Sequence, residues 1–494
     1  MRADRGGERG DLRGQACHIR CGWLPGRAGR GKGGLGEALA AEIAAEVAAL
    51  AVEAARSLAA GEGLEAVELV IRTAMLKLGG RLLEDLLGMD AGHRGPRTSC
   101  GNGHQAGFVS CRPKTIDTVV GPVRLRRAWY HCPACGHGVA PRDGELGIEQ
   151  ASLSPGLQKM TARAAAAVPF ATAAGLLAEL AGVELTVKRT ERSAEAAGVA
   201  AAQAIGRQAD AICSRSVVPL PPPEPLPDML YIAVDGTGVP VVAREAEGRR
   251  GKADDGKART REIKLACLFT QTTLDKEGRP VRDPASTTYL ATFERAERFG
   301  QLLDAEARRR GAAHIRQLVF LGDGAAWIWN LAGQLFPAAT QIVDLYHARE
   351  HLHDLANLAA RLLAGHRDEW LAARLEELDN GDVEAILTAG RDLDFIGSLA
   401  AERDKQLGYF EHNAHRMGYQ HFRDLGMFVG SGVVEAGCKA IIGQRLKLSG
   451  MRWTVPGAVG IATLRCQDAG DRWDEIWQRP HSQTPRTDHI RQAS

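Results

Sequence analysis

Two aspartates, each followed by a glycine, end apolar segments that lie far apart in the chain. Asp235 follows residues 231–234 and Asp323 follows residues 318–322, and both segments have the β-branched, apolar composition of buried strands. A carboxylate at a strand end, beside a glycine that lets the backbone turn, is suited to hold a divalent cation. With a third acid, Glu435, the set would form a two-metal phosphoryl-transfer site. For either aspartate alone, a simple Asp-Gly turn is the alternative.

A third strand-like segment ends in a pair of polar residues. Residues 340–345 form the strand, and Asp344 and His347 lie where it gives way to a helix that carries Glu350. Both side chains should therefore face one region. We expect His347 to orient a scissile phosphate or a metal-bound water. A core histidine bonded to Asp344 is the alternative interpretation.

Residues 97–148 contain the spacing of a zinc site. A C-x-x-C knuckle followed by glycine allows two thiolates to reach one ion, and a sulfur and a nitrogen upstream complete a set of four. The predicted zinc ligands are Cys100, His104, Cys132 and Cys135. Cys111 and His137 are competing fourth ligands, and free thiols on a turn are the alternative. A structural zinc would fold a module that has little core of its own.

Residues 170–193 have the pattern of a helix, a glycine turn at Gly182 and a second helix that Thr186 caps. The outer side of the second helix would offer Lys188, Arg189 and Arg192 to a major groove. This pattern predicts a helix-turn-helix. Ordinary helical packing is the alternative, because such patterns are common in alanine-rich helices.

A basic strip follows Glu435. Lys439 lies four residues later, on the same helical face, and is predicted either to contact DNA phosphate or to pair with Glu435. Further along, Arg445, Lys447, Arg452 and Trp453 continue the strip. We expect the arginines and the lysine to bind a DNA end, and the indole to stack on an unpaired base.

Bulk properties exclude several classes of protein. The 494 residues carry 62 basic and 60 acidic side chains, so nucleic-acid contacts must come from local patches. No apolar run is long enough to span a membrane, and residues 1–35 lack the apolar core of a secretory signal. Ten cysteines in a chain of this length do not indicate a disulfide scaffold. We expect a cytoplasmic bacterial protein, associated with the nucleoid, with no membrane partner.

The chain divides by composition into seven segments. They are a disordered Gly/Arg-rich segment (1–35), a helical region (36–96), a zinc-ribbon-like module (97–148), a helical region with the helix-turn-helix (149–214), a proline-rich linker (215–228), a strand-rich catalytic domain (229–478) and a polar tail (479–494). Within the catalytic domain a helical block at about 348–428 separates the strands from Glu435. The predicted fold class of this domain is α/β.

Four motifs together resemble those of DDE transposases of bacterial insertion sequences, most closely the Kra-type family. They are VDGTGVP at 234–240, GDGAAWIW at 322–329, VDLYHAREHL at 343–352 and GSGVVEAGCK at 430–439. The resemblance covers residues 63–477 and implies a ribonuclease-H-like core, a mixed sheet flanked by helices, with a helical insertion before the glutamate. Carried over by residue, the catalytic triad is Asp235, Asp323 and Glu435.

The resemblance implies a DNA transposase that binds the terminal inverted repeats of its element and catalyses cleavage and strand transfer. Two Mg²⁺ or Mn²⁺ ions per site would be the cofactors, and double-stranded DNA and further copies of the chain the partners. A DNA-binding regulator with an inactive core, and a ribonuclease-H-type nuclease without strand transfer, are the alternatives. The chain departs from the family in its first 35 residues and in keeping only Cys100 of the first zinc knuckle.

Overall fold

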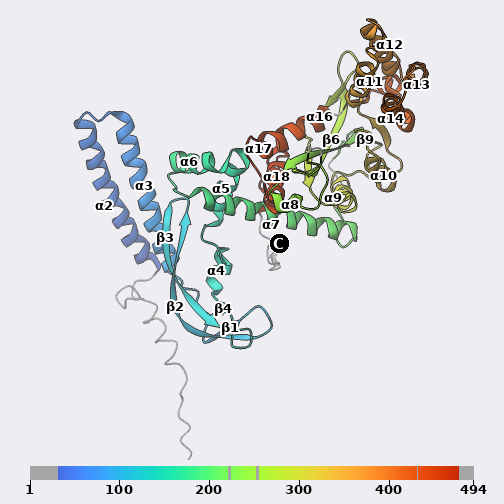
Figure 1. The fold of residues 1–494 in the computed structure, drawn as a ribbon. Helices are drawn as coiled ribbons and strands as arrows, with labels where there is room; N and C mark the ends of the chain where they lie inside the picture. Colours follow the sequence, from blue (N-terminus) through green and yellow to red (C-terminus); the bar gives the residue numbers. More distant parts are fainter. Residues whose placement is uncertain (1–31, 221–223, 252–254, 431, 478–494) are drawn as a thin grey trace, which may run out of the picture. The chain divides into compact units, whose positions relative to one another are not determined.

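A computed structural model describes residues 32–220, 224–251, 255–430 and 432–477 (Figure 1). The chain forms two compact units. The first contains the described residues up to Ala165 together with Phe170–Ser193, and the second contains Ala166–Pro169 and the described residues from Ala194. Of the predicted disordered segment (1–35), residues 1–31 lie outside the described residues, whereas residues 32–35 are helical, so the prediction is wrong there. The polar tail and residues 221–223 of the predicted linker also lie outside the described residues.

The first unit begins with two helices and a small sheet. Helix α2 (Lys32–Ala59) and helix α3 (Gly63–Gly88) form the predicted helical pair, joined at Gly61, whose positive φ of 75° suits glycine. The antiparallel sheet has the order β1 (Arg97–Ser99), β2 (Gln105–Thr118), β3 (Gly121–His131) and β4 (Gly138–Val139). The long β2–β3 hairpin dominates this sheet.

Four helices follow the sheet. They are α4 (Pro141–Leu146), α5 (Pro155–Ala167), α6 (Phe170–Ala181) and α7 (Val187–Cys213). Gly182 ends α6 with a positive φ of 67°, and the hydroxyl of Thr186 accepts a hydrogen bond from the backbone N–H of Arg189 at 3.3 Å. The predicted helix, glycine turn and capped second helix are therefore present. The second helix is long, and the division between the two units falls within it.

The second unit is built on a mixed six-stranded sheet flanked by helices. Its strands are β5 (Met229–Pro240), β6 (Thr260–Leu274), β7 (Pro280–Arg282), β8 (Thr288–Thr292), β9 (Gln317–Gly322) and β10 (Thr340–Val343). Strands β10, β9 and β5 are parallel neighbours, whereas β6 is antiparallel to β5 and pairs with β7 and β8 on its other side. The central strand β5 is fully buried over residues 229–234, as its apolar composition predicts.

Helices cover this sheet and form a separate block beside it. Helices α8 (Ala243–Ala246), α9 (Ala296–Arg309), α10 (Ala326–Leu335), α16 (Gly432–Gly437), α17 (Gln444–Leu446) and α18 (Val455–Ala469) belong to the sheet region. A π-helical turn at Cys438–Gly443 continues α16. The block contains α11 (Leu345–Ala359), α12 (Arg367–Asn380), α13 (Val383–Arg391), α14 (Ser398–Asn413) and α15 (Tyr419–Asp424). It occupies the predicted helical region between Asp344 and Glu435.

One predicted strand boundary is wrong. Strand β5 does not end at Asp235 but continues to Pro240, with Asp235 paired to Leu265 of β6. The glycines at 236 and 238 did not break the strand because β6 continues beside it and supplies its hydrogen-bonding partners. Asp323, by contrast, follows the last residue of β9 as predicted.

Candidate functional site

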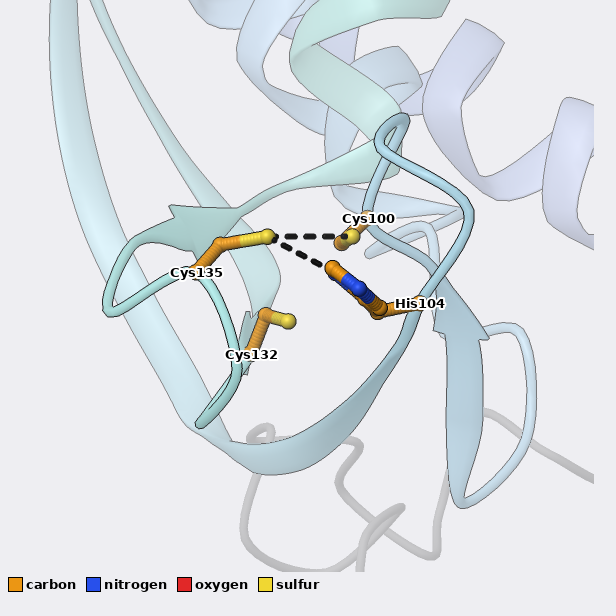
Figure 2. Close-up of side chains that lie close together, drawn as sticks. All are labelled: Cys100, His104, Cys132 and Cys135. Carbon is orange, nitrogen blue, oxygen red and sulfur yellow. Dashed lines mark hydrogen bonds between the residues drawn. The ribbon is translucent and has the colours of Figure 1, made fainter.

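The two turns of the first unit bring together four potential metal ligands (Figure 2). Cys100 and His104 lie in the turn between β1 and β2, and Cys132 and Cys135 in the turn between β3 and β4. One ligand atom from each residue lies within 4.8 Å of the others. Pairing of Gly107 with His131 places the two turns at the same end of the β2–β3 hairpin.

The geometry of this Cys/His cluster fits a tetrahedral ion. The Sγ atoms of Cys100 and Cys135 are 3.7 Å apart, close to the ~3.8 Å expected for two thiolates that bind one zinc at about 2.3 Å. His104 Nδ1 lies 3.1 Å from the same Cys135 sulfur. The pKa of Cys100 is lowered to about 6 by hydrogen bonds, first from the backbone of Asn102, which favours the thiolate that a metal needs. Neither Cys111 nor His137 belongs to the group.

In the second unit, three carboxylates lie on or directly after neighbouring parallel strands. Ala233 of β5 pairs with Leu321 of β9, and Val343 of β10 pairs with Gly322. If both registers are continued by one or two residues, Asp323 lies between Asp235 on one side and Asp344 on the other. Because parallel strands are about 4.8 Å apart, the carboxyl ends of these strands carry a row of three acids.

Asp235 is half-buried and is held by two hydrogen bonds. Its Oδ1 accepts from the N–H of Gly236 at 2.6 Å and its Oδ2 from the thiol of Cys438 at 3.1 Å. Burial raises the pKa of Asp235, the bonds from Cys438 and Gly236 oppose this shift, and the charge of Asp323 adds to it. A buried carboxylate beside another carboxylate is a site that a cation would stabilise.

Asp323 lies in a tight turn between β9 and α10. Its Oδ1 accepts from the N–H of Ala325 at 2.9 Å, and its backbone carbonyl accepts from the hydroxyl of Tyr409 at 3.0 Å. Gly324 has a φ of 102°, and a Cβ there would lie 2.5 Å from the Tyr409 ring. The helical block therefore packs directly on the turn that carries Asp323.

Asp344, His347 and Glu435 form the second candidate metal group among the described residues, with one ligand atom each within 4.8 Å. Asp344 is fully buried and caps α11 by accepting from the N–H of His347 at 2.8 Å. Its Oδ1 also lies 3.2 Å from His347 Nδ1. This bond, together with the charges of Asp344 and Asp323, raises the pKa of His347 to about 9. Asp235 and Asp323 lie outside this group.

The segment before α16 brings Glu435 to this place. The N–H of Leu345 donates to the carbonyl of Val429 at 3.0 Å, which fastens the chain beside the start of α11. A Cβ on Gly430 would lie 2.8 Å from the Tyr346 ring, so glycine permits the close approach. Glu435 is exposed, and Cys438, three residues further along, contacts Asp235. Glu435 therefore lies at the Asp344 end of the row of carboxylates, and Cys438 of the same helical segment contacts Asp235.

The three basic residues predicted for the helix-turn-helix differ in their surroundings. Arg189 forms an ion pair with Asp117 and donates to the carbonyl of Ser152 at 3.0 Å, so it ties α7 to its own unit. Lys188 is exposed and pairs with Glu191 at 2.7 Å. Arg192 is exposed. The Arg189 guanidinium already makes internal contacts, and its contact with DNA stays a prediction.

The basic strip after Glu435 is only partly exposed. Lys439, Lys447 and Arg452 are exposed, and Lys447 donates a hydrogen bond to the Thr237 hydroxyl, two residues after Asp235 on the same strand. Thr237 and Asp235 lie on the same face of β5, because side chains alternate along a strand. Lys447 is therefore held on the face that carries Asp235.

Two members of the predicted strip are wrong as DNA contacts. Arg445 is fully buried, with its guanidinium 5.1 Å from the centre of the Trp453 ring. Trp453 is 4% exposed and its indole N–H donates to the carbonyl of Leu446 at 3.0 Å. Burial also lowers the pKa of Arg445 to about 10. This pair packs the core under α17 and cannot reach a phosphate or stack on a base.

Sequence reasoning missed two residues of the site. Cys438 contacts Asp235, and its position three residues after Glu435 on a helix was the available signal. Tyr409, in α14, reaches the Asp323 turn from the helical block and stacks on His351 at 3.7 Å between ring centres. No local pattern marks Tyr409, because its contact with residue 323 depends on the tertiary fold.

Comparison with known proteins adds no identification: no family model matches the chain, and no curated protein matches it. Across the described residues, no helix combines the length and the apolar character needed to cross a membrane.

Proposed function

We propose that the chain is a DNA transposase that binds the terminal inverted repeats of an insertion sequence and catalyses DNA cleavage and strand transfer. The observation that carries the proposal is the row of acids on β5 and directly after β9 and β10, with Glu435 of α16 close to Asp344 and His347. Ligand sites of open sheets with parallel strands lie at the carboxyl ends of those strands. The resemblance of the four motifs to DDE transposases supports the same function.

The proposed fold of the second unit is ribonuclease-H-like. Its mixed sheet flanked by helices, and the helical block between Asp344 and Glu435, support this assignment. The Cys/His cluster supports a zinc ribbon in the first unit, with Cys100, His104, Cys132 and Cys135 as ligands. The zinc ribbon and the helix-turn-helix would bind double-stranded DNA, and pairing of two element ends would require more than one copy of the chain.

The oxygen donors of the acidic row suit Mg²⁺ or Mn²⁺, which prefer hard ligands. Asp235, Asp323 and Glu435 would hold the metal, with Asp344 and His347 beside it. When bound, a pair of such ions activates a water or a 3′-hydroxyl and stabilises the leaving oxygen. Burial and, to a smaller extent, the charge of Asp323 raise the pKa of Asp235, and a bound cation would oppose both effects.

The chain's own residues would position the DNA. Imidazolium on His347, favoured by its hydrogen bond to Asp344, faces Glu435 and would attract the phosphate that is attacked. Exposed Lys439, Lys447 and Arg452 would contact the sugar-phosphate backbone next to the acids. Cys438 would orient Asp235 through the hydrogen bond from its thiol.

The test is an assay of supercoiled plasmid nicking with Mn²⁺, combined with joining of pre-cut ends taken from the DNA that flanks the gene. Asp235→Asn should abolish both activities and leave binding of the ends unchanged. Glu297→Gln, at an exposed glutamate of α9, is the matched control. Nicking by Asp235→Asn at the wild-type rate would refute the proposed site. If the wild type nicks DNA but does not join ends, a nuclease is favoured. If it binds the ends but does not nick, a DNA-binding regulator is favoured.

A further inference from the structure

A basic cavity lies beyond the acids along strand β5. It has a volume of about 780 Å³ and is formed by the end of β5, α8, the returning segment before β6, and Arg452. Two backbone hydrogen bonds, from Gly251 to Gly256 and from Ala258 to Arg249, join the described residues on this side of the cavity. A cavity of this volume accommodates a ligand of the size of a nucleotide or dinucleotide.

The charge of the lining favours an anion. The cavity is lined by five cationic side chains and two anionic ones: Arg244, Arg249, Lys257, Arg259 and Arg452, against Glu247 and Asp255. Within the described ranges, only Arg259 of these five has an ion-pair partner, Asp255 at 3.1 Å. The remaining cations are exposed, and no carboxylate of the described residues forms an ion pair with them. They are available to phosphate groups.

The rest of the lining indicates which kind of anion the cavity would bind. Pro240, Val241, Ala243 and Ala246 provide an apolar floor beside the cations. A phosphodiester with its deoxyribose presents both characters, whereas inorganic phosphate presents only charge. Among the described residues that line the cavity none is aromatic, so this lining offers no surface on which bases stack. Contact with the backbone, independent of sequence, fits this lining.

Strand β5 connects the cavity with Asp235. Pro240 lies five residues after Asp235 on β5, a distance of ~17 Å at about 3.4 Å per residue. Arg452 is fixed at this end by backbone bonds of Trp453 to Pro240 at 3.1 Å and of Val242 to Trp453 at 2.9 Å. Lys447, bonded to Thr237, lies between the two sites. Lys447 therefore provides a positive charge between Asp235 and the cationic side chains of the cavity.

We propose that this cavity is a second DNA contact, which holds the backbone of the bound strand about five nucleotides from the bond that is cut, at 3.4 Å per nucleotide. The proposal rests on the proposed function of the acidic row and specifies where its substrate is held. The cavity would bind phosphodiesters of any sequence and so fix the register of the DNA on the active site.

The test uses Arg244→Ala/Arg249→Ala in the full chain. Its control is Lys276→Ala/Arg279→Ala, which removes two basic side chains from the exposed turn between β6 and β7. Binding of a fluorescein-labelled 30-base-pair duplex of arbitrary sequence is measured by anisotropy in EDTA over a series of KCl concentrations. Thermal unfolding of both variants verifies that they are folded.

The cavity variant should bind the duplex roughly 60-fold more weakly at 0.1 M salt, since each phosphate contact contributes a factor of about 10^0.9 relative to 1 M salt. The slope of log affinity against log salt should fall by about two, and the control should change neither value. Equal affinity and slope in the two variants would overturn the proposal. If Mn²⁺-dependent nicking by the wild type persists in that case, the proposed function stands without the cavity. If the wild type does not nick but the cavity variant loses binding, the DNA contact stands and the proposed chemistry fails.

Discussion

The charge on His347 gives a prediction that needs no metal and no DNA. Asp344 is fully buried and its Oδ1 lies 3.2 Å from His347 Nδ1, so the imidazolium is stabilised at the acidic row. Asp344→Asn removes the charge but retains an N-cap for α11, because asparagine caps helices as well as aspartate does. We therefore expect the substitution to lower the pKa of His347 without unwinding the helix.

The magnitude follows from the pKa shift. A rise from 6.5 to about 9 corresponds to ~3.4 kcal/mol, and solvent screening of a side chain that is 31% exposed reduces this to ~2 kcal/mol. Because the folded-state pKa lies above the ordinary value, this stabilisation is complete below pH 6.5 and is lost as the pH rises through 9. Asp344→Asn should therefore destabilise the protein more at pH 6 than at pH 9.5.

The assay is NMR of ¹³C-labelled histidine in EDTA, with urea unfolding at the two pH values. The His347 signal is identified by its loss in His347→Gln. In the wild type it should titrate near pH 9, and in Asp344→Asn near pH ~7.5, because ~2 kcal/mol corresponds to about 1.5 pKa units. A wild-type His347 that titrates near 6.5, or a pKa that Asp344→Asn does not change, would refute the electrostatic role given to Asp344.

Two further predictions concern the metal sites. Cys132→Ser should lower the zinc content, measured by atomic absorption, from one ion per chain to none. It should also lower the unfolding temperature of the first unit, because structural zinc contributes directly to folding. An unchanged metal content would contradict the four-ligand cluster. Cys438→Ala should raise the Mn²⁺ concentration for half-maximal nicking about tenfold, the equivalent of one hydrogen bond to a charged group. Cys438→Ser should retain most of the affinity for Mn²⁺, because its hydroxyl can still donate to Asp235. Equal effects of the two substitutions would exclude a role for the hydrogen bond to Asp235.

The strands that carry the aspartates were predictable because their signal is local. Buried parallel strands are continuous apolar runs, and this composition placed β5, β9 and β10 close to their observed positions. The end of β5 was not predictable from the same signal, since Asp235, Gly236 and Gly238 have low strand propensity. Pairing with β6 outweighed that propensity, and this pairing is a property of the tertiary structure.

The prediction that Arg445 and Trp453 contact DNA failed for a different reason. Arg445 and Trp453 have the residue types of a DNA contact, but the chain from α17 to α18 folds against β5 and buries both. A sequence pattern does not distinguish an arginine that stacks on a buried indole from one that faces solvent. Lys447, two residues after Arg445, remains exposed, so the same short segment supplies both a core residue and a surface cation.

The helical block determines how Glu435 reaches the aspartates. The block begins at Leu345, and the N–H of Leu345 donates a hydrogen bond to the carbonyl of Val429. The start of the block and the segment that follows it therefore lie together beside Asp344. The residues in between can therefore vary in length without moving Glu435 away from the sheet, because the cost of closing a longer loop rises slowly with its length. The block is nevertheless coupled to the site, since Tyr409 donates to the carbonyl of Asp323. A change in the packing of α14 would thus act on the acidic row through this bond and through the contact of the Tyr409 ring with Gly324.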